Sequence, residues 1–233
     1  MRADNSLLLG LDTAGSSCSV AIMSKGQVLA SRVEIMRRGQ SERLLPIVQD
    51  LLDETGKDLM DMDGFAVTTG PGGFTGVRIG LATAQGFALA CNKPLVGVNN
   101  FEVLARGVPA AEKTDEPQVV VIIDAKRADL FVQAFDSNLM PLTEPFAVLP
   151  ENLSDKLSGD NLLLVGDGAD QVSEDLKVTG RSISFSKASA NADAGNLLSC
   201  ALEQQLFDRE NQPVEPLYLR APDVSLPKDK TTF

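Results

Sequence analysis

Short apolar runs separated by turn residues dominate the beginning of the chain. The runs cover residues 7–11, 18–23 and 27–36, and a Lys25-Gly26 pair separates the last two. Runs of this length between turn-favouring residues are typical of β-strands, and strands joined by tight turns pair antiparallel. The pattern therefore predicts a three-stranded antiparallel meander.

A helical period replaces the strand pattern from Ser41 onward. Ser41 is a suitable N-cap and Gly56 a suitable end, whereas Pro46 favours a regular helix that begins nearer Leu44. Apolar residues at i, i+1, i+4, i+7 and i+8 share one helix face. They are Leu44, Leu45, Val48, Leu51 and Leu52. The pattern predicts an amphipathic helix with a leucine-rich face.

The rest of the chain alternates strands and helices. Strands are predicted at 65–69, 94–98, 119–123, 130–135 and 162–165, helices at 75–90, 100–106 and 190–206, and an extended tail from Pro213. The mostly polar stretch 109–118, with Pro near both ends, is the expected connection between two domains. We therefore expect an α/β protein with a mixed sheet in each half, the domains being 1–108 and 119–233.

The amino-acid composition excludes several kinds of catalytic and binding site. The 233 residues contain no His, and Lys+Arg 21 against Asp+Glu 32 gives a net charge of −11. Without His there is no imidazole base and no His-ligated metal, and an acidic chain is poorly suited to bind nucleic acid or anionic membranes by itself. The three Cys, at positions 18, 91 and 200, are too far apart for a Cys-x-x-Cys pair, so reduced thiols are expected. No apolar run suits a signal peptide or a membrane span, which predicts a cytoplasmic protein.

The glycine-rich stretch 70–76 invites comparison with phosphate-binding loops. Thr75 stands where both the Walker A loop and the dinucleotide-binding fingerprint require glycine, so neither motif is present. A strand-to-helix turn that needs the conformational freedom of glycine explains the stretch more simply. Anion binding at the start of the next helix is the second interpretation.

The helix predicted after this stretch has a small residue at every fourth position. These residues are Gly76, Gly80, Ala84 and Ala88. Glycine inside a helix costs about 1 kcal/mol relative to alanine, so close packing should offset the cost. Two interpretations remain open, because the stripe could pack against this chain's own sheet or first helix, or against a helix of another subunit.

An aspartate ends the first strand of each half, at Asp12 and at Asp124. Actin-like ATPases and sugar kinases hold Mg²⁺ and phosphate with carboxylates in such positions. On this interpretation Thr13 belongs to a phosphate loop, and Gly166 and Gly168 form a turn on the adenosine side. The alternative is that both aspartates are turn or cap carboxylates.

Four motifs together resemble the TsaB (YeaZ) family. They are Leu-Gly-Leu-Asp-Thr at 9–13, Arg-Gly-Gln-Ser-Glu-Arg-Leu-Leu-Pro at 38–46, Gly-Pro-Gly-Gly-Phe-Thr-Gly-Val-Arg-Ile-Gly-Leu-Ala at 70–82 and Pro-Leu-Tyr-Leu-Arg at 216–220. The resemblance covers essentially the whole chain, and the 70–82 segment is its most specific part.

The resemblance implies two actin/Hsp70-like, RNase H-like subdomains. It also implies a non-catalytic subunit of the complex that makes threonylcarbamoyladenosine (t6A) in tRNA, paired with a TsaD-like catalytic paralogue and assisted by a TsaE-like ATPase. Contact with tRNA would occur only through the complex. The chain alone would bind no cofactor, and ATP or ADP would be a ligand of the complex.

Family members pair through their two N-terminal helices, so the resemblance assigns the partner interface to the predicted helices near Ser41 and Thr75. The residues expected there are Leu44, Leu45, Val48, Leu51, Leu52, Gly76, Arg78, Gly80 and Ala84. A homodimer through the same helices is expected when the chain is alone. One departure is Gln40, where the family often has His. A different function, an independent Mg-dependent actin-like ATPase or small-molecule kinase that uses Asp12 and Asp124, stays open.

Overall fold

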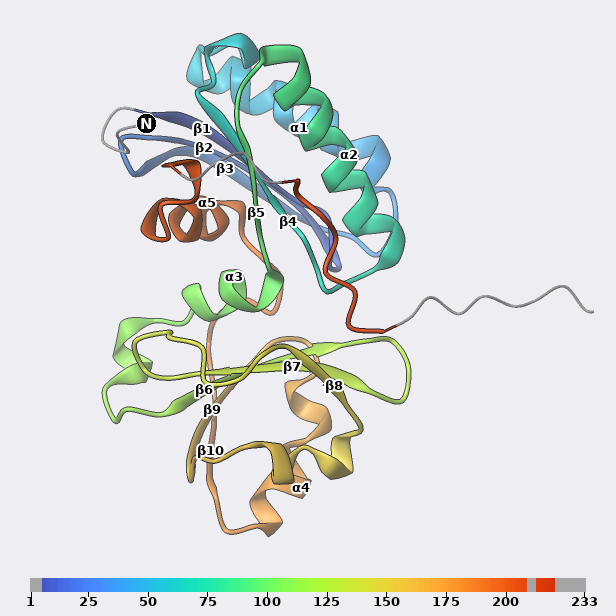
Figure 1. The fold of residues 1–233 in the computed structure, drawn as a ribbon, viewed down its shortest axis with the longest axis vertical. Helices are drawn as coiled ribbons and strands as arrows, with labels where there is room; N and C mark the ends of the chain where they lie inside the picture. The colour runs from blue at the N-terminus through green and yellow to red at the C-terminus, as the bar shows by residue number, and fades with distance from the viewer. Residues whose placement is uncertain (1–5, 209–212, 221–233) are drawn as a thin grey trace, which may run out of the picture.

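Two lobes are stacked along the long axis of the molecule (Figure 1). The structure, a computed structural model, describes residues 6–208 and 213–220. Each lobe is built on one five-stranded sheet. Residues 1–5 and 221–233, which begin and end the two expected domains, lie outside the described residues.

The first sheet has the strand order β3-β2-β1-β4-β5. Its strands are β1 (Leu7–Asp12), β2 (Ser17–Ser24), β3 (Gln27–Ile35), β4 (Gly64–Thr68) and β5 (Leu95–Val98). The first three strands form the predicted antiparallel meander, which is confirmed, and β4 and β5 continue the sheet in parallel from β1.

The second sheet has the order β10-β9-β6-β7-β8 and repeats the first when its strands are taken from the other edge. Its strands are β6 (Gln118–Asp124), β7 (Leu130–Phe135), β8 (Phe146–Val148), β9 (Asn161–Val165) and β10 (Ser182–Phe185). Here too three antiparallel strands are extended by two parallel ones. The repeat confirms the expected α/β class of two actin/Hsp70-like subdomains. Strands β8 and β10, of three and four residues, are absent from the sequence prediction.

Helices cover both sheets, as Figure 1 shows. They are α1 (Gln40–Thr55), α2 (Phe74–Cys91), α3 (Asn100–Arg106), α4 (Ser173–Val178) and α5 (Ala194–Glu203). Helices α1 and α2 lie on one face of the first sheet and α5 on the other, while α3 lies between α5 and the second sheet. Within the described ranges, no helix is long and apolar enough to cross a membrane.

The starts of α1 and α5 differ most from the prediction. Helix α1 begins at Gln40, with Gly39 as its N-cap in the left-handed region (φ 98°), and Pro46 lies inside the helix. Helix α5 begins four residues later than predicted, at Ala194, because the side chain of Asp193 caps its first turn.

Side chains that alternate along β1 build a core on each face of the first sheet. Leu9 and Leu11 pack on the side of α1 and α2, whereas Leu8 packs on the side of α5, and all three are 0% exposed. Glycine is required at position 10, because an added Cβ would lie 2.9 Å from Cγ of Leu198 in α5. Helix α5 is therefore an integral part of the first lobe.

The expected domain boundaries need a correction. Helix α5 follows the whole second sheet in sequence but packs on the first sheet. In the opposite direction, Phe101 and Leu104 of α3 pack on the second sheet. The reason is that the first sheet has two apolar faces, and α1 and α2 cover only one of them. We define the first lobe as residues 6–99 and 194–208, and the second lobe as residues 100–193.

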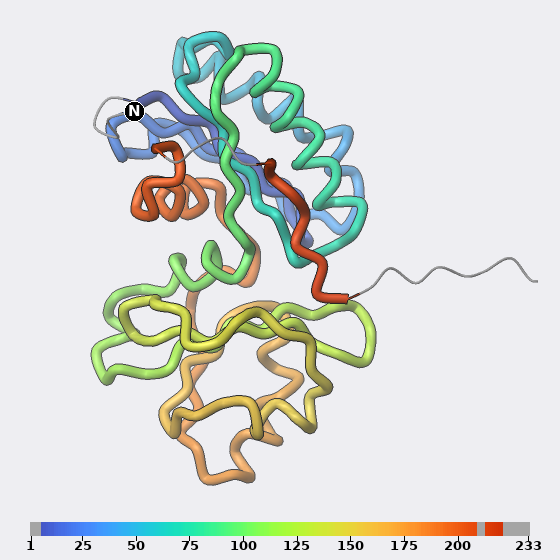
Figure 2. Tube along the Cα trace, viewed as in Figure 1, coloured from blue at the N-terminus to red at the C-terminus, as the bar shows by residue number. Residues whose placement is uncertain are grey.

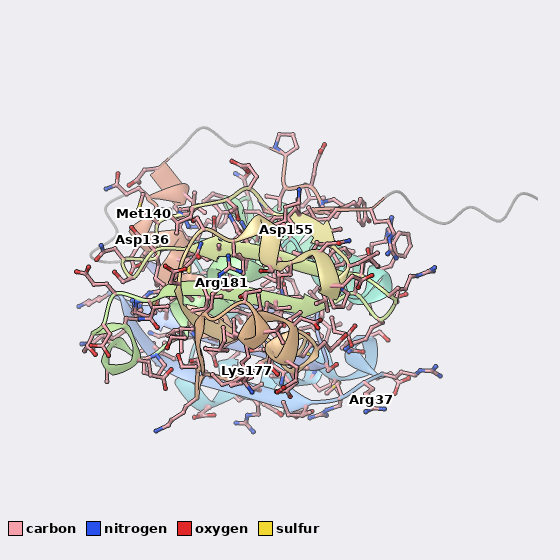
Figure 3. All side chains as sticks on the ribbon, turned by 90° about the horizontal axis from the view of Figure 1, so that it is seen from below. Arg37, Asp136, Met140, Asp155, Lys177 and Arg181 are labelled. Atoms are coloured by element: carbon pink, nitrogen blue, oxygen red, sulfur yellow. The ribbon has the colours of Figure 1, made fainter. Side chains whose placement is uncertain are left out.

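Short helical segments cover the far face of the second sheet, which Figure 3 shows from below. Arg181, labelled there, immediately precedes β10 and connects this strand to residues 154–157. Its guanidinium donates hydrogen bonds to the carbonyl oxygens of Ser154 (3.0 Å) and Leu157 (2.8 Å). The short elements are thus fixed by side-chain contacts as well as by packing.

Candidate functional site

Most of the leucine-rich face of α1 lies in the core of this chain. Leu44, Val48, Leu51 and Leu52 are at most 6% exposed and pack on the first sheet. The sheet face needs an apolar cover, and the amphipathic helix provides it. The expected interface is corrected here, because these four side chains cannot contact a partner while they stay in this core. Leu45, at 54% exposed, does face outward.

The small-residue stripe of α2 also faces inward. An added Cβ at Gly76 would lie 2.2 Å from the carbonyl oxygen of Thr13, and one at Gly80 would lie 2.8 Å from Thr13 Oγ1. Ala84 is 0% exposed. The stripe lets α2 approach the end of β1, so packing within this chain is the correct interpretation. The expectation that Gly76, Gly80 and Ala84 contact a partner is corrected accordingly.

A second row of side chains on α2 faces away from the sheet. Its members follow one another at helical spacing and are all exposed. They are Phe74, Arg78, Ala82, Gln85 and Leu89. Phe74 is 55% exposed and Leu89 84%. We call this row, together with Leu45 of the neighbouring helix α1, the outer surface.

A cation–aromatic cluster marks the N-terminal end of the outer surface. The Cζ atom of Arg78 lies 3.2 Å from the ring centroid of Phe74 and 5.3 Å from that of Tyr218. The two rings are 5.9 Å apart, with an angle of 28° between their planes. Such contacts stabilise exposed sites by about 0.5–1 kcal/mol each. Tyr218 is missing from the expected site, although Pro-Leu-Tyr-Leu-Arg, which contains the only Tyr of the chain, was a signal that could have found it.

Asp12 is fully buried at the end of β1. Its Oδ1 accepts hydrogen bonds from Thr68 Oγ1 (2.6 Å), the backbone N–H of Ala14 (3.3 Å) and Asn100 Nδ2 (3.4 Å). Desolvation raises the pKa of Asp12 to about 6, although these hydrogen bonds act to lower it, and nearby Asp193 raises it further. Its Oδ2 accepts no hydrogen bond from the described residues. The carboxyl group is closed off from solvent by the first lobe and its junction with α3.

Asp124 has a different environment at the end of β6. The Lys126 ammonium lies 3.1 Å from Asp124 Oδ2 and 2.8 Å from Asp167 Oδ2. Partial desolvation acts to lower the pKa of Lys126, but the hydrogen bonds to Asp167 and Asp124 outweigh it, and the pKa is raised. The Lys126 ammonium therefore pairs with both carboxylates and offsets part of their negative charge.

The glycines of the predicted adenosine turn are needed for close packing. Gly166 has φ 110°, and an added Cβ would lie 2.1 Å from the carbonyl oxygen of Ile122. The backbone N–H of Gly168 donates to that same oxygen at 3.1 Å. This turn is therefore attached directly to β6.

The residues of the predicted nucleotide cleft fall into two separately bonded groups. Asp124, Gly166 and Gly168 meet at one end of the second sheet. Among the described residues, no hydrogen bond or ion pair joins these three to Asp12 or Thr13, whose partners are Gly76, Thr68, Ala14 and Asn100. The arrangement favours the turn-and-cap interpretation of both aspartates.

Comparisons with known proteins agree with one another. A family model described as TsaD, tRNA N6-adenosine threonylcarbamoyltransferase, matches residues 27–204, which is more than half of the chain. The chain is 40% identical over 124 residues to the tRNA threonylcarbamoyladenosine biosynthesis protein TsaB of Escherichia coli (strain K12), covering 53% of this chain and 52% of that protein. The match thus spans about half the length of that relative.

Two further relatives match over most of their length. The TsaB protein of Haemophilus influenzae is 29% identical over 233 residues, with 93% of this chain and 94% of that protein covered. The solved structure of YeaZ from Pseudomonas aeruginosa has a TM-score of 0.74 and 30% identity, covering 92% of this chain and 100% of that chain. The TsaD family model matches this chain as well, and the chain belongs to the TsaB (YeaZ) family.

Proposed function

We propose that this protein is a non-catalytic subunit in the biosynthesis of threonylcarbamoyladenosine in tRNA, where it binds and activates a TsaD-like catalytic paralogue. The names of its TsaB relatives and the match to the TsaD family model support a role in this pathway. The absence of His supports the non-catalytic part, because the chain offers neither an imidazole base nor a His ligand for a metal.

The observation that carries the proposal is the outer surface. It presents Leu45, Phe74 and Leu89 to solvent on two neighbouring helices whose opposite faces are already packed on the sheet. A helix pair of this kind can pack against a second helix pair, and exposed aromatic and Arg side chains are the residues that most often dominate binding energy at interfaces. The docking surface proposed here therefore leaves out the inward-facing residues of α1 and α2 that the sequence analysis assigned to the interface.

Activation would follow from differential affinity. A subunit that binds only the active conformation of its partner raises the population of that conformation. A net charge of −11 is consistent with leaving tRNA contacts to other members of the complex. In this scheme the TsaE-like ATPase and ATP or ADP are components of the complex.

The buried state of Asp12 argues against the rival function, an independent Mg-dependent ATPase or kinase. A carboxylate with 0% exposure and a pKa of about 6 is a poor ligand for a hydrated cation. On this proposal the purified chain does not hydrolyse ATP by itself, and a measured turnover that Asp12→Ala abolishes would contradict it.

The test compares three single substitutions by titration calorimetry with the TsaD-like paralogue. Leu45→Glu and Leu89→Glu place a charge on the outer surface, and each is expected to weaken binding at least tenfold, about 1.4 kcal/mol. Val178→Glu is the matched control, because Val178 is 88% exposed on α4 in the second lobe. Modification of tRNA by the reconstituted complex should fall with binding.

Unchanged binding and unchanged modification in both outer-surface variants would refute the docking proposal. Sedimentation of the chain alone tests the homodimer that we propose for the same helices, since exposed apolar surfaces tend to self-associate. Leu89→Glu should then shift the chain toward the monomer, whereas Val178→Glu should not.

A further inference from the structure

An extended C-terminal segment runs alongside the first lobe and reaches the second. Residues 213–220, which we call the C-terminal strap, descend beside α2 and β4 to the level of the second sheet, in red in Figure 1 and Figure 2. The strap has no regular secondary structure. It is held in place by contacts with both lobes.

The strap is attached to the first lobe through the backbone of Leu217 and the side chain of Val214. The backbone N–H of Leu217 donates to the carbonyl oxygen of Thr69, just after β4, at 2.8 Å. The Val214 side chain packs on Gly97 of β5 so closely that an added Cβ there would lie 2.6 Å from it. The strap therefore follows the ends of two strands of the first sheet.

The strap is also attached to the second lobe, through the side chains of Leu217, Leu219 and Arg220. Leu217 and Leu219 pack against the cluster that α3 forms with β6 and β9. Arg220 forms an ion pair with Asp129, immediately before β7, and the Asp129 side chain is only 13% exposed. A partly buried pair of this kind is less screened by water than a surface pair. The strap thus bridges the two lobes.

Tyr218 lies between these two attachments and belongs to the cation–aromatic cluster. Its ring stacks on Phe74 at the N-terminal end of α2, and both rings are about half exposed. A guanidinium that stacks on a ring keeps its in-plane N–H groups for a carboxylate. The strap therefore adds an aromatic side chain to the outer surface, next to a cation that can pair with an acidic residue.

We propose that the C-terminal strap makes docking of the partner depend on how the two lobes are arranged. Phe74, Arg78 and Tyr218 form one continuous binding surface only while the Arg220–Asp129 pair anchors the strap to the second lobe. The occupant is the TsaD-like paralogue, which would present an apolar side chain to the rings and a carboxylate to Arg78; to this extent the inference rests on the proposed function.

The strap connects two lobes, so it can restrict their movement relative to each other. Most buried apolar residues cluster within one lobe, and Val103 of α3 and Ala192 join the cluster of the first lobe. Lobes of one chain move relative to each other unless a large apolar interface prevents it. A partner that binds the assembled cluster would favour the lobe arrangement that the strap holds. In turn, an arrangement that displaces Tyr218 would lower the affinity for the partner.

The first experiment uses the chain alone. Arg220→Ala should increase hydrogen exchange at the backbone N–H of Leu217 at least fivefold, because the far anchor of the strap is lost. Lys177→Ala is the matched control, since it removes a Lys whose ion pair with Glu174 lies within α4 of the second lobe. Unchanged exchange in Arg220→Ala would overturn the bridging role.

The second experiment adds the paralogue. Arg220→Ala should weaken binding at least fivefold, although Arg220 lies outside the outer surface, and Tyr218→Ala should weaken it at least tenfold. Arg220→Asp combined with Asp129→Arg should restore most of the affinity, which a general loss of folding would not allow. Faster exchange without any change in affinity would overturn the dependence of docking on the strap.

Different results would refute the proposed docking function and the proposed role of the strap. If Leu45→Glu and Leu89→Glu leave binding intact, the proposed docking function is refuted. If those variants weaken binding and Arg220→Ala does not, docking stands and the role of the strap is refuted.

Discussion

The hydroxyl group of Thr13 donates a hydrogen bond of 2.7 Å to the carbonyl oxygen of Gly76. This bond joins the residue after β1 to the first turn of α2, at a point where the two backbones touch. Because the helix lies so close to the strand, glycine is required at positions 76 and 80 of α2.

Gly76→Ala is therefore expected to lower the free energy of unfolding by about 3 kcal/mol, the effect of overpacking a tight contact. The added Cβ would lie 2.2 Å from a backbone oxygen, which no side-chain rotation can relieve. Urea denaturation measures the change.

Gly86→Ala in the same helix is the control for that experiment. An added Cβ at Gly86 meets nothing within 4 Å, so the variant should gain about 1 kcal/mol from helix propensity alone. Equal stability of Gly76→Ala and the parent protein would contradict the close contact.

The stability of the chain should depend on the ionisation of Asp12. Burial raises the pKa of Asp12 from 3.8 to about 6, so the folded state holds the proton more tightly than the unfolded state. The resulting stability is fully present below about pH 4 and is lost as the pH rises through about 6. A shift of about two units corresponds to about 3 kcal/mol.

Asp12→Asn should remove this dependence. The variant is expected to match the parent near pH 4 and to exceed its free energy of unfolding above pH 6, as measured by urea denaturation across the range. Asp50→Asn, at an exposed position of α1, should leave the parent's profile in place. Parallel pH profiles for Asp12→Asn and the parent would show that Asp12 titrates normally.

The three thiols should be unreactive in the folded chain. Cys18, Cys91 and Cys200 are at most 6% exposed, and burial raises the pKa of Cys18 and of Cys200 to about 12. At pH 8 only about one thiol in ten thousand is then ionised at these two positions, and the thiolate is the reactive form. Ellman's reagent should react slowly until guanidinium unfolds the chain and all three thiols respond. Fast labelling of the folded protein would contradict this.

The order of strands and helices could be predicted from the sequence because their apolar periods differ. Periodicity does not say what covers an apolar face. The leucine-rich face of α1 has the same pattern whether it packs on Phe65 of its own sheet or on another subunit, and the stripe from Gly76 to Ala88 has the same ambiguity.

The sequence alone could not predict which segments far apart in the chain contact each other. Asp12 and Asp124 end equivalent strands, yet the packing around each one decides whether its carboxylate reaches solvent. Tyr218 joins Phe74 only because the strap turns back along α2. Helix α5 was predicted in roughly the right place, but its amphipathic pattern contains no information about which sheet it joins.

The return of α5 to the first sheet affects how the chain is synthesised. While a ribosome makes the protein, the underside of the first sheet, with Leu8 and Ala66, has no cover until residue 203 has left the exit tunnel. By then the whole second sheet has already emerged. The first lobe is therefore the first to begin folding and the last to finish. During that interval its uncovered apolar face can form non-native contacts.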